Sequence, residues 1–215
     1  MEKPEIILVG GGGHCKSCID VIEAEDRFTI KGIIDLPKMH GNMILGYPVI
    51  GNDDDLSGFA KAGCNFLITL GHMGNADLRK KLFKTIKSNG GQLPIIMAPS
   101  SVVSKYAEIG AGSIIMHQSI VNAEAKIGMN CIINNKALVE HDVTIGDDCH
   151  VSTDVNINGD CIISDGVFIG SAATLKNGIH IAENTIIGLG AVVIKSIKER
   201  GVYAGNPAIK LQKNE

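Results

Sequence analysis

The sequence predicts a small α/β domain at the N-terminus, followed by a left-handed parallel β-helix built from hexapeptide repeats. Two observations predict this fold class. Before residue 100, short apolar runs alternate with helical stretches, which is typical of a βαβ domain with a parallel sheet. From Val103 to Val193, an aliphatic residue recurs at every sixth position. We therefore expect one domain over residues 1–98 and a second over residues 99–215.

The composition narrows the class of protein. The chain has 215 residues and is 45% hydrophobic, which is enough to form a buried core. Its formal net charge of −3 argues against a broadly basic surface for nucleic acid, so small-molecule partners are favoured. The apolar segment Ile6–Val9 is too short for a signal sequence or a membrane span. We therefore expect no membrane span and a cytoplasmic location.

The first elements are a strand, a turn and a helix. The apolar run Ile6–Val9 enters the glycine-rich turn Gly10–Gly13, and the following helical stretch places Ile19, Val21 and Ile22 on one side. A second strand, residues 30–34, ends at Asp35.

A third strand is expected over residues 66–70 and ends at Gly71. Asn75 then caps a helix over residues 76–87, and residues 94–97 form the last strand of this domain.

Candidate ligand-binding residues gather at one edge of this predicted sheet. Parallel sheets bind ligands beyond the carboxyl ends of their strands, near helix N-termini whose free N–H groups attract phosphate. The dinucleotide fingerprint is not met, because Lys16 stands where its third glycine belongs, and the P-loop pattern is also missing. Neither NAD nor ATP is therefore our first choice, and a plain tight turn is the structural alternative. The candidate substrate-binding residues are Gly12, Gly13, His14, Asp35 and Gly71.

The period of six determines the second domain. A column of mostly small residues stands four positions after each aliphatic one, so each hexad supplies a short strand and a corner. Three hexads close a triangular coil, and the stretch from Val103 to Val193 predicts about five coils. The small column contains Cys131, Cys149 and Cys161, which we assign to packing rather than to a metal site.

The remaining histidines and cysteines give weaker signals. Cys15 and Cys18 form a C-x-x-C at the predicted helix start, but no second pair completes a zinc site, so we interpret the spacing as coincidence. His117 and His180 are interpreted as ordinary surface residues. His141 is the third residue of its hexad and should face outward beside Asp142.

Several motifs together resemble one family. The chain is similar to the nucleotide-sugar N-acetyltransferases of the bacillosamine and perosamine pathways, and to the related sialic acid O-acetyltransferases. The resemblance spans nearly the whole chain. The motifs that carry it are Gly10–His14, Ile33–Asp35, Glu140–Asp142, Cys149–Ser152 and Gly201–Ala208.

The resemblance implies a homotrimer that binds acetyl-CoA along the β-helix between neighbouring subunits and a nucleotide-linked amino sugar on the N-terminal domain. It also implies that His141 is the general base, that Asp142 raises its basicity, and that His150 lies by acetyl-CoA. Further coenzyme contacts are expected from the backbone of Gly159, Gly170 and Gly188 and from Lys195 near a phosphate, with turn geometry as the alternative for the glycines.

The predicted chemistry is direct attack of a sugar amine on the thioester. A base whose pKa lies near the working pH removes the proton best, and an imidazole oriented by a carboxylate meets that need. Backbone N–H groups at the coil edges are the expected donors to the thioester oxygen. A serine nucleophile is disfavoured because the chain has no G-x-S-x-G elbow.

Three alternatives remain open on the sequence. O-acetylation of a sugar hydroxyl is the nearest. A non-catalytic solenoid that binds a nucleotide sugar is the second. A trimeric zinc carbonic anhydrase would need three converging imidazoles, but His141 and His150 lie nine residues apart, not five, so no metal is expected. Whether the nucleotide is UDP, GDP or CMP is not readable from the residues.

Overall fold

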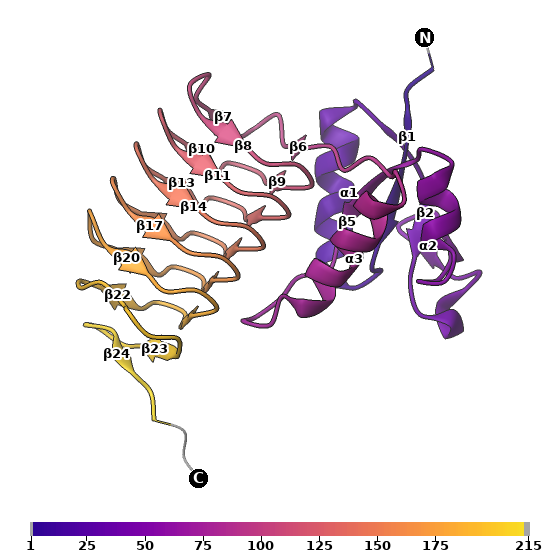
Figure 1. The fold of residues 1–215 in the computed structure, drawn as a ribbon. Coiled ribbons are helices and arrows are strands. Elements are labelled where there is room, and N and C mark those ends of the chain that lie inside the picture. The colour runs from indigo at the N-terminus through magenta and orange to yellow at the C-terminus, as the bar shows by residue number, and fades with distance from the viewer. Residues whose placement is uncertain (1, 213–215) are drawn as a thin grey trace.

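The structure, a computed structural model, describes residues 2–212 and has two parts that lie side by side (Figure 1). The N-terminal part is a five-stranded sheet in the order β3-β4-β2-β1-β5, parallel except for the β3–β4 pair. In chain order, the elements of the N-terminal part are β1 (Glu5–Val9), α1 (Gly13–Glu25), β2 (Thr29–Ile34), the 3₁₀ turn η1 (Pro37–Met39), β3 (Met43–Ile44), β4 (Tyr47–Gly51), α2 (Leu56–Lys61), β5 (Asn65–Ile68) and α3 (Asp77–Ser88).

The central strand β1 is buried on both faces. Ile6 and Leu8 pack with α1, whereas Ile7 and Val9 pack with α3. Successive side chains of a strand point to opposite faces, so a continuous apolar run is what a strand covered on both sides requires. The strands and helices predicted at residues 6–9, 30–34, 66–70 and 76–87 are confirmed within a few residues, whereas β3, β4 and α2 were not predicted.

The predicted last strand of the N-terminal domain belongs elsewhere. β6 (Ile96–Met97) pairs in parallel with β9 (Ile114–Ile115), which is part of the β-helix. The expectation that it joins the N-terminal sheet is therefore wrong. A two-residue apolar run carries no information about its hydrogen-bonding partner, which is a long-range choice.

The C-terminal part is a prism with three parallel sheets, which we call faces A, B and C. Face A contains β7 (Val102–Val103), β10 (Ile120–Val121), β13 (Leu138–Val139), β16 (Asn156–Ile157), β19 (Thr174–Leu175) and β22 (Val192–Val193). Face B contains β8 (Glu108–Ile109), β11 (Lys126–Ile127), β14 (Thr144–Ile145), β17 (Ile162–Ile163) and β20 (His180–Ile181). Face C contains β6, β9, β12 (Ile132–Ile133), β15 (His150–Val151), β18 (Phe168–Ile169), β21 (Ile186–Ile187), β23 (Val202–Ala204) and the antiparallel β24 (Ile209–Lys210).

The chain visits faces A, B and C in turn, so β7 to β21 make five complete coils, as the period predicts. The aliphatic ladder lies inside the prism, where its members from Ile115 to Val193 are at most 4% exposed. Cys131, Cys149 and Cys161 fill the second inward column, which confirms their packing role. Hydrophobic burial between stacked coils therefore stabilises the prism.

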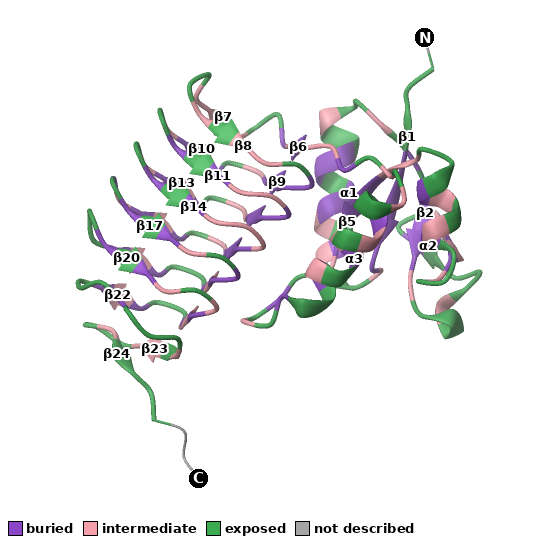
Figure 2. Cartoon of the chain, viewed as in Figure 1, coloured by how far each residue is buried: buried purple, intermediate pink, exposed green. Residues whose placement is uncertain are grey.

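The N-terminal domain covers face C. The outward residues Ile114, Ile132 and His150 of this face are buried, whereas the equivalent Ile120 on face A and Ile162 on face B are 38% and 50% exposed. In Figure 2 the strands turned toward the N-terminal domain are purple, and the strand surfaces on the far side of the prism are largely green. The apolar core is thus shared between the two parts.

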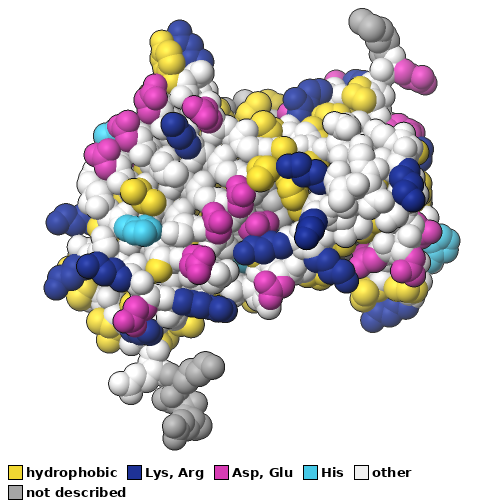
Figure 3. Space-filling view, in the orientation of Figure 1, with side chains coloured by type: hydrophobic (Ala, Val, Ile, Leu, Met, Phe, Trp, Pro, Cys, Tyr) yellow, Lys and Arg dark blue, Asp and Glu magenta, His cyan; other side chains and the backbone are white. Residues whose placement is uncertain are grey.

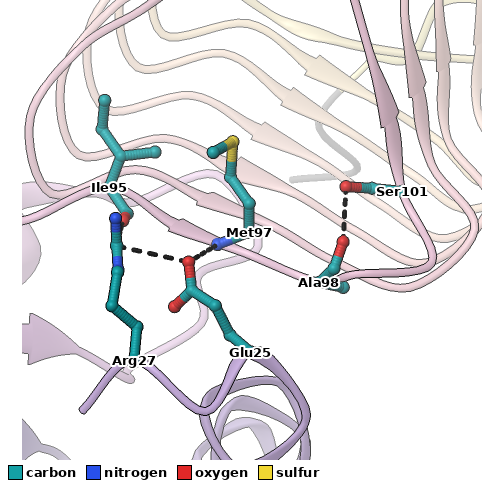
Figure 4. Close-up of polar contacts among 6 residues, drawn as sticks. All are labelled: Glu25, Arg27, Ile95, Met97, Ala98 and Ser101. Carbon is teal, nitrogen blue, oxygen red and sulfur yellow. Dashed lines mark hydrogen bonds and ion pairs between the residues drawn. The ribbon is translucent and has the colours of Figure 1, made fainter.

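Glu25 at the end of α1 and Arg27 just after it form hydrogen bonds with backbone groups at the free edge of face C (Figure 4). The Glu25 carboxylate accepts a hydrogen bond from the Met97 N–H at 3.2 Å, and Arg27 donates to the Ile95 carbonyl while pairing with Glu25. An uncovered strand edge invites pairing with another chain. These contacts therefore cap the first strand of the prism.

The helix α3 runs along the edge between faces B and C. Its Phe83 ring lies against Gly112, where an added Cβ would come within 2.9 Å. Lysine and acidic side chains gather over this line, in the centre of the view in Figure 3. Lys80 on α3 and Asp147 on the prism are both close enough to Asp148 to act on its charge. No helix within residues 2–212 combines the length and apolar character that crossing a bilayer requires.

Candidate active site

His141 and Asp142 occupy a corner of the third coil, between β13 and β14, and hence lie on the edge between faces A and B. Asp142 has a φ of 60°, in the left-handed region that the prism uses repeatedly at its corners. Aspartate tolerates that region better than most residues. The corner therefore places the two side chains outward, and the predicted exposure of His141 is confirmed, with 56% of its side chain accessible.

The imidazole and the carboxylate form a hydrogen bond of 2.7 Å between Nδ1 of His141 and Oδ2 of Asp142. This bond raises the pKa of His141 above its usual value of 6.5, and the charges of Asp142, Asp160 and Glu140 act in the same direction. A carboxylate accepts only, so Nδ1 carries the proton and Nε2 is left as the acceptor. The arrangement can remove a proton from a nucleophile that approaches the exposed edge.

Gly159 lies one coil further along, on the same edge. A Cβ at this position would come within 2.6 Å of Cε1 and 2.8 Å of Nε2 of His141. The imidazole therefore occupies the space beside the glycine, and any side chain there would displace it. This spatial role, the accommodation of the imidazole ring, was not foreseen from the sequence.

Lys195 is on the A/B edge as well, just after β22. It is three coils beyond His141, and with strands spaced at about 4.8 Å this amounts to roughly 14 Å along the edge. Lys195 lines a cavity of about 540 Å³ together with Tyr203 and Pro207. Lys195 and His141 therefore lie on the same edge of the prism.

Gly170 and Gly188 lie on a different edge, between faces C and A. A Cβ on Gly170 would meet backbone atoms of Leu189 at 2.6 Å and Gly188 at 2.8 Å, and one on Gly188 would meet Ala204 at 2.9 Å. Close packing of successive corners explains both glycines. Within one chain they are not brought together with His141.

His150 is also remote from that edge. It projects outward from face C, is 8% exposed, and has its Nδ1 2.8 Å from the backbone oxygen of His72. Burial lowers its pKa to about 4. The N-terminal domain of the same chain covers this side chain.

The glycine-rich turn and Asp35 meet at the carboxyl ends of β1 and β2, as predicted. Oδ2 of Asp35 accepts a hydrogen bond from the Gly11 N–H at 3.1 Å, and Oδ1 accepts one from the Leu36 N–H at 2.7 Å. Gly12 and Gly13 open α1, and neither has a neighbour within 4 Å of an added Cβ, so their backbone borders open space.

A cavity of about 240 Å³ adjoins this edge of the sheet. It is lined by Val9, Gly10, Ile34, Asp35, Leu36, Asp53, Leu70, Leu78 and Leu82. Its walls are apolar and its only charged groups are carboxylates, which suits a flat ring and hydroxyl or amine donors.

His14 and Gly71 lie between this edge and the prism. An added Cβ on Gly71 would be 3.8 Å from His14, and the His14 ring centroid is 6.2 Å from that of His150. Burial, with the charges of His150 and Arg79, lowers the pKa of His14 to about 3. His72 completes this group of buried imidazoles, with its ring 5.5 Å from His150 and its pKa also lowered to about 3 by burial. Neither His72 nor Arg79 was singled out from the sequence.

Other histidines and cysteines that the sequence singled out are bonded to serines or buried. His117 and His180 form hydrogen bonds of 2.9 Å with Ser100 and Ser164. Cys15 and Cys18 are buried, and burial raises the pKa of both thiols. In the part of the chain that the structure describes, no three His, Cys, Asp or Glu side chains are grouped to hold a metal ion.

Comparison with known proteins places the chain in a family. The family described as "PglD N-terminal domain" matches residues 5–86. PerB from Caulobacter crescentus, solved with CoA and GDP-perosamine, is 30% identical over 97% of both chains, with a TM-score of 0.89. A comparison with curated proteins found no significant match.

Two further solved structures agree. The acetyltransferase domain of PglB from Neisseria gonorrhoeae FA1090, solved with acetyl coenzyme A, is 27% identical over 97% of this chain and 100% of that chain, with a TM-score of 0.90. WeeI from Acinetobacter baumannii AYE is 26% identical over the same shares, with a TM-score of 0.85. The fold and these relatives define an acyltransferase of the hexapeptide-repeat class. Within that class, the chain belongs to the nucleotide-sugar N-acetyltransferases.

Proposed function

We propose that this protein transfers an acetyl group from acetyl-CoA to the amino group of a nucleotide-linked 4-amino-4,6-dideoxy sugar, with His141 as the general base. One observation carries the proposal. An exposed imidazole, hydrogen-bonded at 2.7 Å to a carboxylate, stands on an open edge of the prism in a chain of this family. Because acetyl-CoA and nucleotide sugars are cytoplasmic metabolites, we place the reaction in the cytoplasm.

The chemistry follows from the protonation of the imidazole. The sugar amine attacks the thioester carbon, and as the C–N bond forms, Nε2 of His141 takes the amine proton. Asp142 orients the ring and stabilises the imidazolium. Collapse of the intermediate expels the CoA thiolate. The proton held by the His141 imidazolium passes to this thiolate, so CoA leaves as the thiol and the base is regenerated. Backbone N–H groups of the corners are the donors that we assign to the developing oxyanion.

Within one chain the base and the sugar-binding domain are on opposite sides. The A/B edge, which carries His141, is the edge of the triangle opposite face C, and the N-terminal domain covers face C. Figure 1 shows β13 and β14 on the far side of the prism from α1 and α3. A single chain therefore separates the proposed base from the proposed acceptor site.

Face A of the prism is suited to contact a second copy of the chain, which could bring the base and the acceptor site together. The outward residues of face A carry no charge, in contrast to Glu108 and Lys126 on face B. The face A residues are Val102, Ile120, Leu138, Asn156, Thr174 and Val192. An uncharged, partly apolar face suits burial between subunits. We assign face A to the subunit contacts of the homotrimer.

This assembly brings the predicted base and the predicted coenzyme-binding residues of two neighbouring subunits together. When three copies turn face A toward a common axis, the A/B edge of one copy comes against the C/A edge of the next. His141, Gly159 and Lys195 of one subunit then oppose Gly170 and Gly188 of its neighbour. We propose that the pantetheine arm of acetyl-CoA lies in this groove, with Lys195 at a phosphate, and that His150 belongs to the neighbour's acceptor side.

The nucleotide sugar is assigned to residues 1–98, and acetyl-CoA to residues 99–215. The cavity beside Asp35 takes the nucleoside, and the N–H groups of Gly12 and Gly13 at the start of α1 take the diphosphate. His14 and Gly71, between this edge and the prism, then face the sugar.

The test uses acetyl-CoA with a panel of UDP- and GDP-linked 4-amino-4,6-dideoxy sugars and their 4-hydroxy counterparts, followed by thiol release. We expect turnover with an amino sugar and a large loss in H141A. H180A is the matched control, because His180 is also exposed on the prism and has only a serine partner. Turnover by H141A near the wild-type rate would refute the base assignment. Preferred turnover of a hydroxy sugar would favour O-acetylation, and stoichiometric zinc would favour the carbonic anhydrase alternative.

A further inference from the structure

Arg79 is a buried cation with an unusual set of partners. It is 2% exposed, lies on α3, and forms no ion pair within residues 2–212. Its guanidinium instead donates four hydrogen bonds, all to neutral oxygens. The chain therefore places a charge in the interface between its two parts without a direct counter-ion.

The four bonds connect the N-terminal domain to the prism. Nη1 donates to the carbonyls of Ile68 at 2.9 Å and Leu70 at 2.5 Å, where β5 ends. Nη2 donates to the carbonyl and the side-chain oxygen of Asn130 at 2.9 and 2.7 Å, on the B/C edge. The planar fork of arginine makes both sets at once, which a single ammonium cannot do.

The contacts continue to the loop that follows β5. Asn130 donates to the Asp148 carboxylate at 2.6 Å, and the backbone oxygen of Asp148 is 3.1 Å from Nε2 of His72. The backbone oxygen of His72 is in turn 2.8 Å from Nδ1 of His150. Loop residues 69–75 are thus held at several points, and Gly71 within this loop borders His14.

Arg79 combines a desolvation cost with bonds to both parts of the chain. Burial lowers its pKa to about 10, so the guanidinium stays charged at neutral pH and bears a desolvation cost. Well-packed apolar residues can replace buried ion pairs at little cost, but Arg79 has no ion-pair partner. An apolar residue here would leave the bonded oxygens of Ile68, Leu70 and Asn130 without these donors. What an apolar residue cannot do is fix two separate segments in one geometry.

We propose that Arg79 is a positioning residue, which locks loop 69–75 and with it the acceptor sugar at the angle needed to meet the thioester. The inference rests on the proposed function. Subunits of the trimer contact through face A, so the angle of each N-terminal domain on its own prism sets where its sugar meets the neighbour's A/B edge. Reactions of this kind lose about 100-fold in rate for a misplacement of roughly 1 Å.

The experiment compares R79K and R79M with E25A in the full-length protein. Glu25, the last residue of α1, also joins the two parts through its bond to the Met97 N–H (Figure 4). It is not among the residues assigned to the proposed site. Steady-state rates are measured below every melting transition, together with acetyl-CoA binding by titration calorimetry. Hydrogen–deuterium exchange of residues 69–75 reports the loop itself.

We expect R79K to lower kcat by about 10- to 100-fold while its affinity for acetyl-CoA stays within about twofold of wild type. Exchange of residues 69–75 should rise in R79K and R79M but not in E25A. The proposal is overturned if R79K keeps a kcat within about threefold of E25A, or if loop exchange is unchanged in R79K. Absence of acetyl transfer by the wild-type protein would instead refute the proposed function, and the exchange measurement would still decide whether Arg79 holds the loop.

Discussion

Replacing Gly159 by alanine tests the geometry of the proposed base with the smallest possible change. A Cβ at this position would lie 2.6 Å from Cε1 and 2.8 Å from Nε2 of His141. Gly159 does not have a positive φ, so its backbone conformation is open to alanine. The methyl group therefore acts on the imidazole rather than on the fold.

The magnitude follows from the distances. Ordinary contact begins at 3.4 Å, so the ring must retreat by about 0.8 Å. Its Nδ1 is held at 2.7 Å by Asp142, so the ring either loses this bond or carries Nε2 away from the amine. A displacement of this size in a proton-transfer geometry costs on the order of 100-fold in rate. Both consequences lower kcat.

The assay is thiol release at saturating substrates for wild type, G159A, H141A and the double variant, with melting temperatures measured in parallel. G159A should lose about 100-fold in kcat while its melting temperature stays close to that of wild type, and the double variant should equal H141A. G58A, in α2 with free space around the added methyl group, is the control that leaves kcat unchanged. A G159A enzyme with more than half of wild-type kcat, or a further loss in the H141A background, would refute the reasoning.

Three further measurements test the other parts of the argument. The rate should rise with pH as the His141 imidazolium loses its proton, with a midpoint above 6.5. D142N should move that midpoint downward, because it removes the carboxylate that raises the pKa of His141. An unchanged midpoint in D142N would contradict the coupling between His141 and Asp142. His150 has a folded pKa of about 4 against 6.5 when unfolded, so its stabilising contribution is complete above pH 6.5 and is lost as pH falls toward 4. Acidification from pH 7.5 to 4.5 should therefore cost about 2.5 kcal/mol through this group, and denaturant titrations of H150Q should show a correspondingly flatter pH dependence. I120D on face A should yield monomers by light scattering and abolish turnover, because it buries an unpaired carboxylate between subunits, whereas I162D on face B should do neither.

Local periodicity was sufficient to predict most of the fold. Each coil repeats the same short-range demand for an aliphatic and a small residue at a spacing of six, so Val103 to Val193 could be placed inside the prism from their order alone. The same register placed His141 on the outside. In the N-terminal domain, the strand–turn–helix pattern located Asp35 and the glycines at one sheet edge.

Long-range choices escaped prediction. The partner of β6 is one, because two apolar residues suit either sheet. The burial of His150 is another, because an outward position on a prism is exposed or covered according to what docks there.

The sequence by itself determined the repeat, the presence of two parts and the pairing of His141 with Asp142, because these depend on neighbours one to six residues away. Only the tertiary structure decided which face the N-terminal domain covers and what surrounds Arg79 and Gly159. Those features depend on residues tens of positions apart, such as Asn130 and Arg79, whose contact has no local signature. The physical reason is that backbone propensity acts over a few residues, whereas packing and burial are settled by the whole chain.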